Sequence, residues 1–126
     1  MSPQRRWLRG LRRVTLVLAL AGIGYLGYRF DVVPMPSTRC SPVARFEAGD
    51  RLVVDLRPAA IQPGDAVLIR DAEGGLHLVV VSATRDDGAR LWCSSDCPDC
   101  EGFDSAAVGW VDRRAVTGRV LLAWVY

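Results

Sequence analysis

The sequence predicts a mainly β domain behind a single N-terminal transmembrane helix. Three observations support this fold class: an uncharged apolar run at 14–28, prolines shortly after it, and short β-type runs separated by turn residues in the remainder. The chain has 126 residues, of which 50% are hydrophobic, which is enough for one domain. We therefore expect an Arg-rich segment (1–13), a membrane anchor (14–30) and an exterior β domain (31–126).

The predicted anchor is the uncharged run VTLVLALAGIGYLGY, from Val14 to Tyr28. As a helix with a rise of about 1.5 Å per residue it would be about 22 Å long, which is less than a hydrocarbon core of about 30 Å. Flanking apolar and arginine side chains must therefore complete the span. The alternative is a signal peptide with an A-x-A cleavage site at Ala19–Ala21. The apolar run continues past that site, which favours an uncleaved anchor.

Arginine is distributed unevenly along the chain. Residues 1–30 contain six arginines and no acidic residue, whereas residues 31–126 contain ten arginines against fourteen acidic residues. Because five of the six arginines precede the anchor, the positive-inside rule predicts a cytoplasmic N-terminus on the inner (cytoplasmic) membrane. The C-terminal domain is then periplasmic or otherwise extracytoplasmic. Its excess of acidic residues argues against a nucleic-acid partner.

The remainder of the chain alternates between β-type runs and turn signals. Three prolines within 31–42 exclude continuation of the helix there. Gly74-Gly75 separates two apolar runs in the manner of a hairpin turn, and Asp87-Gly88 precedes a further run. The expected strands are 51–56, 66–70, 76–84, 91–92 and 118–126.

Four segments resemble, in the same order, the signature segments of bacterial type I signal peptidases. The first is MPSTRCSPV at 35–43 followed by FEAGDRLVVD, which is similar to the family's I-P-S-x-S-M-x-P-T and G-D-x-x-V-V. PGDAVLI at 63–69 resembles the G-D-x-V strand, GFDSAAVGWV at 102–111 the S-x-D-S-R-x-x-G-x-V segment, and TGRV at 117–120 the closing I-x-G-R-V. The resemblance covers most of residues 14–126 and implies a signal-peptidase-like β fold.

In that family a serine nucleophile is activated by a buried, neutral lysine, and this sequence lacks both residues. The alignment places Arg39 at the nucleophile position and Val79 at the lysine position, and all 16 basic residues of the chain are arginine. A guanidinium stays protonated and therefore does not replace the lysine as a base. We expect a pseudoenzyme: a signal-peptidase-like protein without Ser/Lys endopeptidase activity.

The four cysteines are the main candidate site residues. Cys93, Cys97 and Cys100 have C-x3-C-x2-C spacing, and the resemblance implies that the loop carrying Cys40 meets this segment in the cleft. Two disulfides are one interpretation, because the domain is expected in an oxidising compartment. A metal site is another, because cysteine thiolates bind zinc tetrahedrally and also hold iron–sulfur clusters. A free, reactive thiol is the third.

Three further residues are candidates from their pattern. His77 is the only histidine, and on a strand it shares a face with Val79, so a Cys40–His77 pair could act as an altered nucleophile with its base. Asp104 and Ser105 match the family's D-S pair, and the resemblance implies that this pair holds the catalytic residues in position without reacting itself. The alternative role of Asp104 is to cap the backbone of a turn.

These observations lead to one main hypothesis and two alternatives. The main hypothesis is a membrane-anchored protein with a peptide-binding or metal-holding cleft, whose partner is an extended segment of an exported protein or a membrane complex. The alternatives are an active processing peptidase that uses Cys40, and a redox protein that uses the cysteine cluster.

Overall fold

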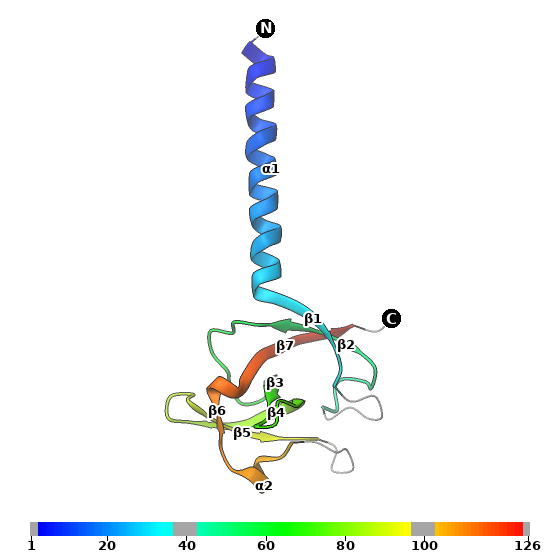
Figure 1. The fold of residues 1–126 in the computed structure, drawn as a ribbon, viewed down its shortest axis with the longest axis vertical. Coiled ribbons are helices and arrows are strands. Elements are labelled where there is room, and N and C mark those ends of the chain that lie inside the picture. Colours follow the sequence, from blue (N-terminus) through cyan, green and yellow to red (C-terminus); the bar gives the residue numbers. More distant parts are fainter. Residues whose placement is uncertain (1–2, 37–42, 97–102, 125–126) are drawn as a thin grey trace.

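The computed structural model describes residues 3–36, 43–96 and 103–124. In these residues a long helix projects from a curled, seven-stranded antiparallel sheet with strand order β1-β2-β7-β3-β4-β5-β6 (Figure 1). The elements are α1 Pro3–Arg29, β1 Phe30–Pro34, β2 Arg51–Asp55, β3 Ala66–Arg70, β4 Leu76–Arg85, β5 Arg90–Ser94, α2 Ser105–Val108, β6 Val111–Asp112, the 3₁₀ turn Arg113–Ala115 and β7 Val116–Trp124. The expected mainly β domain behind one N-terminal helix is confirmed at this level.

Helix α1 is longer than the anchor expected at 14–30, because it also includes the Arg-rich residues before it. It begins at Pro3, and proline is favourable at the first helical position, whose N–H has no acceptor within the helix. The helix is long and apolar enough to cross a membrane, and none of its side chains is buried. It ends where β1 begins, ahead of two valines and Pro34, which disfavour a helical backbone.

All five expected strands form, as β2, β3, β4, β5 and β7, with ends shifted by a few residues. Strand β1 is a finding that the sequence did not predict, because Pro34 and Pro36 are typical of loops. Proline is compatible with an edge strand, where its missing N–H faces away from the neighbouring strand. The predicted hairpin between β3 and β4 is confirmed: Gly74 has φ +87°, and the N–H of Asp71 donates to the carbonyl of Gly75 at 2.9 Å.

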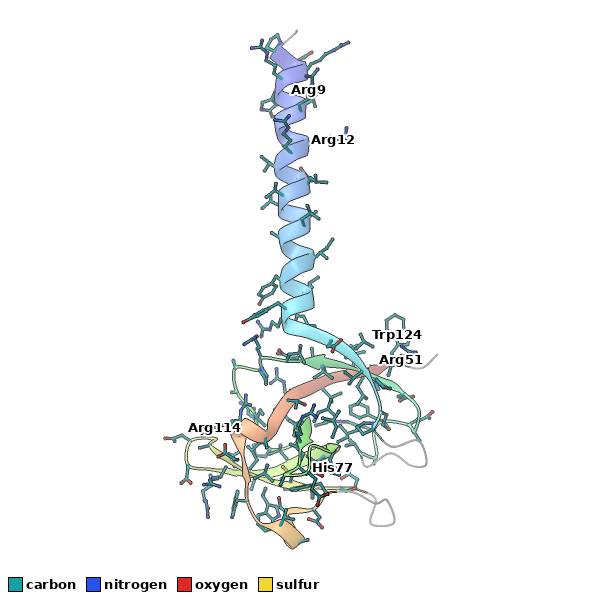
Figure 2. The ribbon with its side chains drawn as sticks, in the orientation of Figure 1. Arg9, Arg12, Arg51, His77, Arg114 and Trp124 are labelled. Carbon is teal, nitrogen blue, oxygen red and sulfur yellow. The ribbon has the colours of Figure 1, made fainter. Side chains whose placement is uncertain are left out.

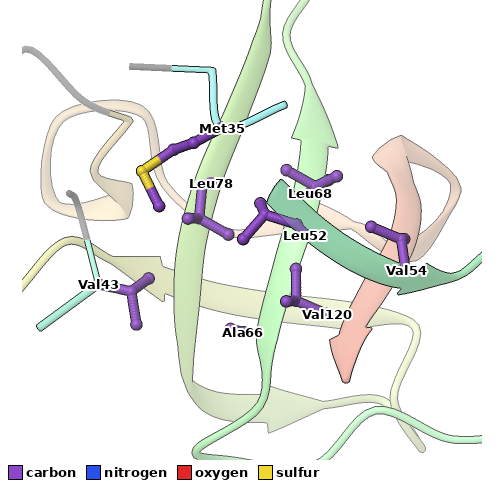
Figure 3. Close-up of a cluster of buried hydrophobic side chains, with 8 residues drawn as sticks. All are labelled: Met35, Val43, Leu52, Val54, Ala66, Leu68, Leu78 and Val120. Carbon is purple, nitrogen blue, oxygen red and sulfur yellow. The ribbon is translucent and has the colours of Figure 1, made fainter. Parts of the chain in front are cut away.

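Buried side chains form two clusters on the two faces of the curled sheet. The first core cluster combines strand residues such as Leu52, Leu68 and Leu78 with Met35 and Val43, which lie outside the strands (Figure 3). The second core cluster contains Ile61, Val67, Ile69, Val79, Val81, Leu91, Cys93 and Val111. Because successive strand residues point to opposite faces, β3 contributes to both clusters, which explains its unbroken apolar sequence.

Gly118 allows β7 to pass closely between its two neighbours. Strand β7 pairs with β2 through Arg119–Trp124 and with β3 through Val116–Arg119. A Cβ atom at Gly118 would overlap the side chain of Val54 and lie 2.9 Å from the carbonyl oxygen of Asp55. The glycine of the TGRV segment therefore has a packing role.

Candidate functional site

The structure brings together the described flanks of two cysteine-bearing segments. Residues 37–42, which include Arg39 and Cys40, and residues 97–102, which include Cys97 and Cys100, lie outside the described residues. The residues next to these segments are in contact: the N–H of Ala44 donates to Asp96 Oδ2 at 2.9 Å, across 52 positions of sequence. The predicted cleft that contains all four cysteines stays a prediction.

The described residues that flank both segments also pack in the core. Met35 and Val43, on either side of residues 37–42, are buried in the first core cluster beside Leu78 (Figure 3). Phe103, which follows residues 97–102, packs against the second core cluster. The ends of the two segments are thus fixed relative to β4, which contributes to both clusters.

Cys93 has the environment of a core residue. In the part of the chain that the structure describes, it is a free cysteine with no exposed surface, on β5 in the second core cluster. Burial raises the pKa of its thiol to about 11. A nucleophile needs the thiolate, so a thiol held protonated by burial does not fit that role. Among residues 3–36, 43–96 and 103–124, no group of three His, Cys, Asp or Glu side chains is arranged to hold a metal ion.

Asp104 and Ser105 close the outer edge of β5. Strand β6 pairs only with the first two residues of β5, which leaves the N–H of Cys93 facing away from β4. This N–H donates to the buried Ser105 Oγ at 2.9 Å. Asp104 Oδ1 accepts from the N–H of Ala106 at 2.9 Å and so caps the short helix α2, as the turn interpretation predicted.

Val79 and His77 share a face of β4, as predicted from the strand period. Val79 lies opposite Val67 and is fully buried in the second core cluster, so a core side chain occupies the position aligned with the family lysine. His77 is half-buried at the margin of that cluster, where its ring centroid lies 5.9 Å from that of Phe103.

Asp71 is a candidate residue that the sequence analysis missed. Its Oδ2 lies 2.7 Å from His77 Nε2, and its Oδ1 accepts from the N–H groups of Glu73 and Gly75 at 2.9 and 2.7 Å. The hydrogen bond with His77 and those from the turn hold the pKa of the Asp71 carboxyl below its usual range. The imidazole is therefore oriented by a carboxylate. An aspartate at the start of a Gly-Gly turn, six positions before the only histidine, was the available signal.

Along Leu76–Val79 the edge of β4 has no paired strand among the described residues, although Leu78 and Val79 are buried. We call this run the open edge of β4. Strand β4 pairs with β3 over Leu76–Val80 but with β5 only from Val80 onward. The N–H of Val81 points toward β3 and donates to the carbonyl of Asp65, just before β3, at 2.9 Å. Because backbone groups alternate in direction along an antiparallel strand, those of Leu76 and Leu78 point to the other side. Within the described residues no strand pairs with them there.

The edge of β1, in contrast, is closed to an added strand. The N–H of Met35 donates to the carbonyl of Asp50 at 3.1 Å, so the odd-numbered residues of this segment face β2 and the even-numbered ones face outward. Of the outward groups, the N–H of Val32 is bound by its neighbour Asp31 Oδ1 at 2.8 Å, and Pro34 has no N–H. Occupied donors and proline are devices that protect edge strands from pairing.

Fold and site together define a class: an antiparallel β domain with an N-terminal helix of membrane-spanning length, in which part of the edge of β4 has no paired strand among the described residues. No protein-family model, curated protein or solved structure matches the chain. The resemblance of the four segments to signal peptidases therefore stays a prediction.

Proposed function

We propose that this protein is a membrane-anchored, signal-peptidase-like protein that binds an extended peptide without cleaving it by Ser/Lys chemistry. The observation that carries the proposal is the open edge of β4 at Leu76–Val79, next to the flanks of the two cysteine-bearing segments. The partner is an exported protein, or a subunit of a membrane complex, that presents an extended segment outside the inner membrane. The N-terminus is cytoplasmic in this proposal, since five arginines precede the apolar run.

A bound segment would extend the sheet as one more strand. The outward N–H and C=O groups of Leu76 and Leu78 supply the backbone hydrogen bonds for such pairing. Side chains of the added strand alternate between the two faces of the sheet. One set would then lie on the side of the first core cluster, which contains Met35 and Val43, and the other on the side of His77 and Phe103. The site therefore favours a peptide with apolar residues at every second position.

The absence of Ser/Lys catalysis rests on residue types. The chain contains no lysine, and Val79, aligned with the family lysine, is fully buried among apolar side chains. The position aligned with the nucleophile is Arg39. Neither side chain can take a proton from a hydroxyl at neutral pH.

We infer that Cys40, Cys97 and Cys100, without Cys93, are the cysteines that share the cleft. Cys93 packs among the apolar side chains of the second core cluster, and the other three cysteines belong to the two segments whose flanks meet at Ala44 and Asp96. Three cysteines allow one disulfide with one remaining thiol, or a zinc or iron–sulfur site that takes its remaining ligand elsewhere. Metal analysis and thiol counting on protein purified without oxygen distinguish these states.

Peptide binding is tested by removing one outward N–H from the open edge. Leu76→Pro removes the donor at the first residue of β4, where proline is tolerated in a strand. We expect the full-length protein to bind a short fluorescent peptide of alternating Val and Ser about 2- to 10-fold more weakly, the equivalent of one hydrogen bond of about 0.5–1.5 kcal/mol. Fluorescence anisotropy measures the affinity.

Val32→Pro is the matched control, because it removes an outward N–H from the closed edge of β1. It should leave peptide affinity unchanged. Equal affinities for the wild type and Leu76→Pro would contradict binding at β4. Cleavage of a preprotein by the wild-type chain would contradict the proposed lack of peptidase activity.

The His77–Asp71 hydrogen bond favours a second candidate function, a processing peptidase that uses Cys40 as nucleophile. A nucleophile needs a base, and the base is effective when a third group orients it, as Asp71 orients His77. In this case Cys40→Ala and His77→Gln would each abolish preprotein cleavage, whereas Cys93→Ala would not. Absence of cleavage by the wild type eliminates this candidate.

A further inference from the structure

A pocket of about 590 Å³ lies between three segments of the chain: residues 59–61, the β4–β5 turn at 87–90, and residues 112–114. Its size is typical of sites that hold a side chain or a small ligand. It lies beyond the C-terminal end of β4, whereas the open edge of β4 lies at the start of that strand. Figure 2 shows Arg114 and Trp124 at opposite ends of β7, so the pocket lies at the end of β7 away from Trp124. We call it the turn pocket.

Arg113 fixes the walls of the turn pocket relative to one another. Its N–H donates to the carbonyl of Ala89 in the β4–β5 turn at 3.0 Å, and its guanidinium donates to the carbonyl of Pro58 at 3.1 Å. On the third wall, Asp112 Oδ1 accepts from the N–H of Arg114 at 2.8 Å. The shape of the pocket is therefore set by contacts within the chain and needs no ligand to form.

Two arginines of the turn pocket have side chains without a partner. In the part of the chain that the structure describes, the guanidinium groups of Arg90 and Arg114 make no ion pair or hydrogen bond. Arg90 lies opposite Asp112 in the β5–β6 register, but no ion pair joins the two side chains. With Arg113, the pocket has three guanidinium groups against the carboxylates of Asp87 and Asp112. It thus carries an excess of one positive charge, in a domain whose acidic residues outnumber its arginines by fourteen to ten.

Two tryptophans lie beside these arginines, on the face of β5 that is turned away from the second core cluster. Trp92 follows Arg90 by two positions on the strand and so projects from the same face. The rings of Trp92 and Trp110 meet edge to face with centroids 5.3 Å apart, and the guanidinium of Arg85 lies 4.6 Å from the ring of Trp110. Both rings are half-buried, and neither is among the described residues of the two core clusters. Because Arg85 lies opposite Arg90 in the β4–β5 register, the tryptophans continue the surface of the turn pocket.

The arginines and tryptophans together select an acidic polypeptide as the ligand. A pair of guanidinium groups binds a carboxylate through short, charge-assisted hydrogen bonds. Tryptophan and arginine are enriched at the centres of protein–protein interfaces, where each contributes a large contact area and hydrogen-bond donors. A free inorganic anion has no apolar part that could contact Trp92 and Trp110. A nucleic acid is disfavoured, because the domain as a whole is acidic.

We propose that the turn pocket binds a side-chain carboxylate from an acidic segment of another protein through Arg90 and Arg114, while Trp92 and Trp110 contact the neighbouring apolar part of that segment. Asp87 and Asp112 line the same pocket and repel a second carboxylate, so the pocket takes one acidic side chain. The proposal is independent of peptide binding at the open edge of β4 and of membrane anchoring.

The first test is protection of arginines from phenylglyoxal, a reagent that modifies exposed guanidinium groups. The full-length chain is treated in detergent with and without a peptide of alternating Glu and Leu, and mass spectrometry identifies the modified arginines. We expect the peptide to slow the modification of Arg90 and Arg114 several-fold and to leave Arg70, which is exposed on β3 outside the pocket, unaffected. A peptide of alternating Gln and Leu should protect none of the three. Equal modification of Arg90 with and without the Glu peptide overturns the proposal, and equal protection by inorganic phosphate overturns an acidic polypeptide as the ligand.

Arginine variants then measure the contribution of each guanidinium to the affinity. Arg90→Gln and Arg114→Gln should each weaken binding of the Glu–Leu peptide by about 2- to 10-fold, as expected for one charge-assisted contact at an exposed site, and fluorescence anisotropy measures this change. Arg70→Gln is the matched control, because it removes the same charge elsewhere on the domain and should leave the affinity unchanged. Leu76→Pro should leave the protection of Arg90 unchanged, which separates this site from the open edge of β4. Unchanged affinity in both pocket variants would assign the binding to the arginines that precede the anchor and overturn the proposal.

Discussion

Two aspartates, Asp55 and Asp71, each hold a part of the sheet in place. Asp55 does so where the end of α1 meets β2 and β7, which we call the junction, and Asp71 does so in the β3–β4 hairpin. Asp55 is buried between Arg29 and Arg119, and its hydrogen bond to Arg29 spans 26 positions of sequence. Asp71 is half-buried, and its hydrogen bond to His77 spans six positions. The contacts of Asp55 with Arg29 and Arg119 join α1, β2 and β7, whereas the contact of Asp71 with His77 stays within one hairpin.

The two carboxylates also differ in why the pKa of each is low. Burial acts to raise the pKa of Asp55, but the N–H of Arg57 and the guanidinium of Arg29 outweigh it and hold the pKa below its usual range. For Asp71 the hydrogen bond with His77 contributes most, followed by the N–H of Gly75. Loss of Asp55 should therefore affect how the anchor joins the sheet, and loss of Asp71 should affect the hairpin alone.

The largest expected effect concerns Cys93, in the core cluster behind the hairpin. Its pKa of about 11, raised from 9.0, lowers the thiolate fraction at neutral pH about a hundredfold. We expect no alkylation of Cys93 by iodoacetamide at pH 8 in the folded protein and complete alkylation after denaturation, as read by peptide mass spectrometry. Rapid labelling of Cys93 in the folded state would show that the second core cluster opens to solvent.

The next effect compares one glycine in each region. Gly118→Ala places a methyl group against Val54 and the carbonyl of Asp55 at the junction, and it should destabilise the protein by about 1–3 kcal/mol. Gly75→Ala in the hairpin meets the end of the Asp71 side chain and no backbone atom, so it should cost less than Gly118→Ala, although Asp71 must give up part of its hydrogen bonding to make room. Chemical denaturation measures both values. A larger loss for Gly75→Ala would reverse the expected order.

Acid sensitivity should depend more on Asp55 than on Asp71. Both carboxyls have a lower pKa in the folded than in the unfolded chain, so their contribution to stability is complete above the unfolded-state value of about 4 and is lost as the pH falls through the folded-state value. We expect Asp55→Asn to reduce the difference in unfolding free energy between pH 7 and pH 3. Asp71→Asn should reduce it less, because Asp71 is more exposed. Equal pH profiles for Asp55→Asn and the wild type would show that Asp55 does not respond to acid.

The smallest expected effect is that of His77→Gln. It removes the hydrogen bond with Asp71 from a half-exposed pair and should cost about 0.5–1 kcal/mol. Hydrogen exchange should rise at the turn amides of Glu73 and Gly75 and stay unchanged at the junction amide of Leu56. Increased exchange at Leu56 would mean that the hairpin and the junction are coupled.

Much of the fold was predictable from local patterns. The apolar run within α1, the strands at 66–70 and 76–84 and the Gly74-Gly75 hairpin each depend on neighbouring residues, and each is found in the structure. Strand β1 was not predictable in this way, because the prolines that mark it as non-helical are also typical of loops. Its place at the edge of the sheet, which makes Pro34 acceptable, depends on pairing with β2.

The candidate site shows the same division. The absence of lysine and the shared face of His77 and Val79 follow from the sequence and the strand period. The C-x3-C-x2-C spacing, however, gave no sign that Cys93 is buried, because burial depends on which strands lie against β5. The His77–Asp71 contact is local in sequence, but a turn aspartate has many alternative partners.

The sequence by itself determined a membrane-length apolar helix, a β domain with defined hairpins, and the absence of lysine, because residue types and short-range periodicity decide these features. Only the tertiary structure decided that Asp55 joins Arg29 to Arg119, that no strand of the described residues pairs with β4 along Leu76–Val79 on the side of β5, and that Trp124 is exposed. These features depend on the register between strands far apart in the chain, which is set by the packing of the whole core and by no local signal.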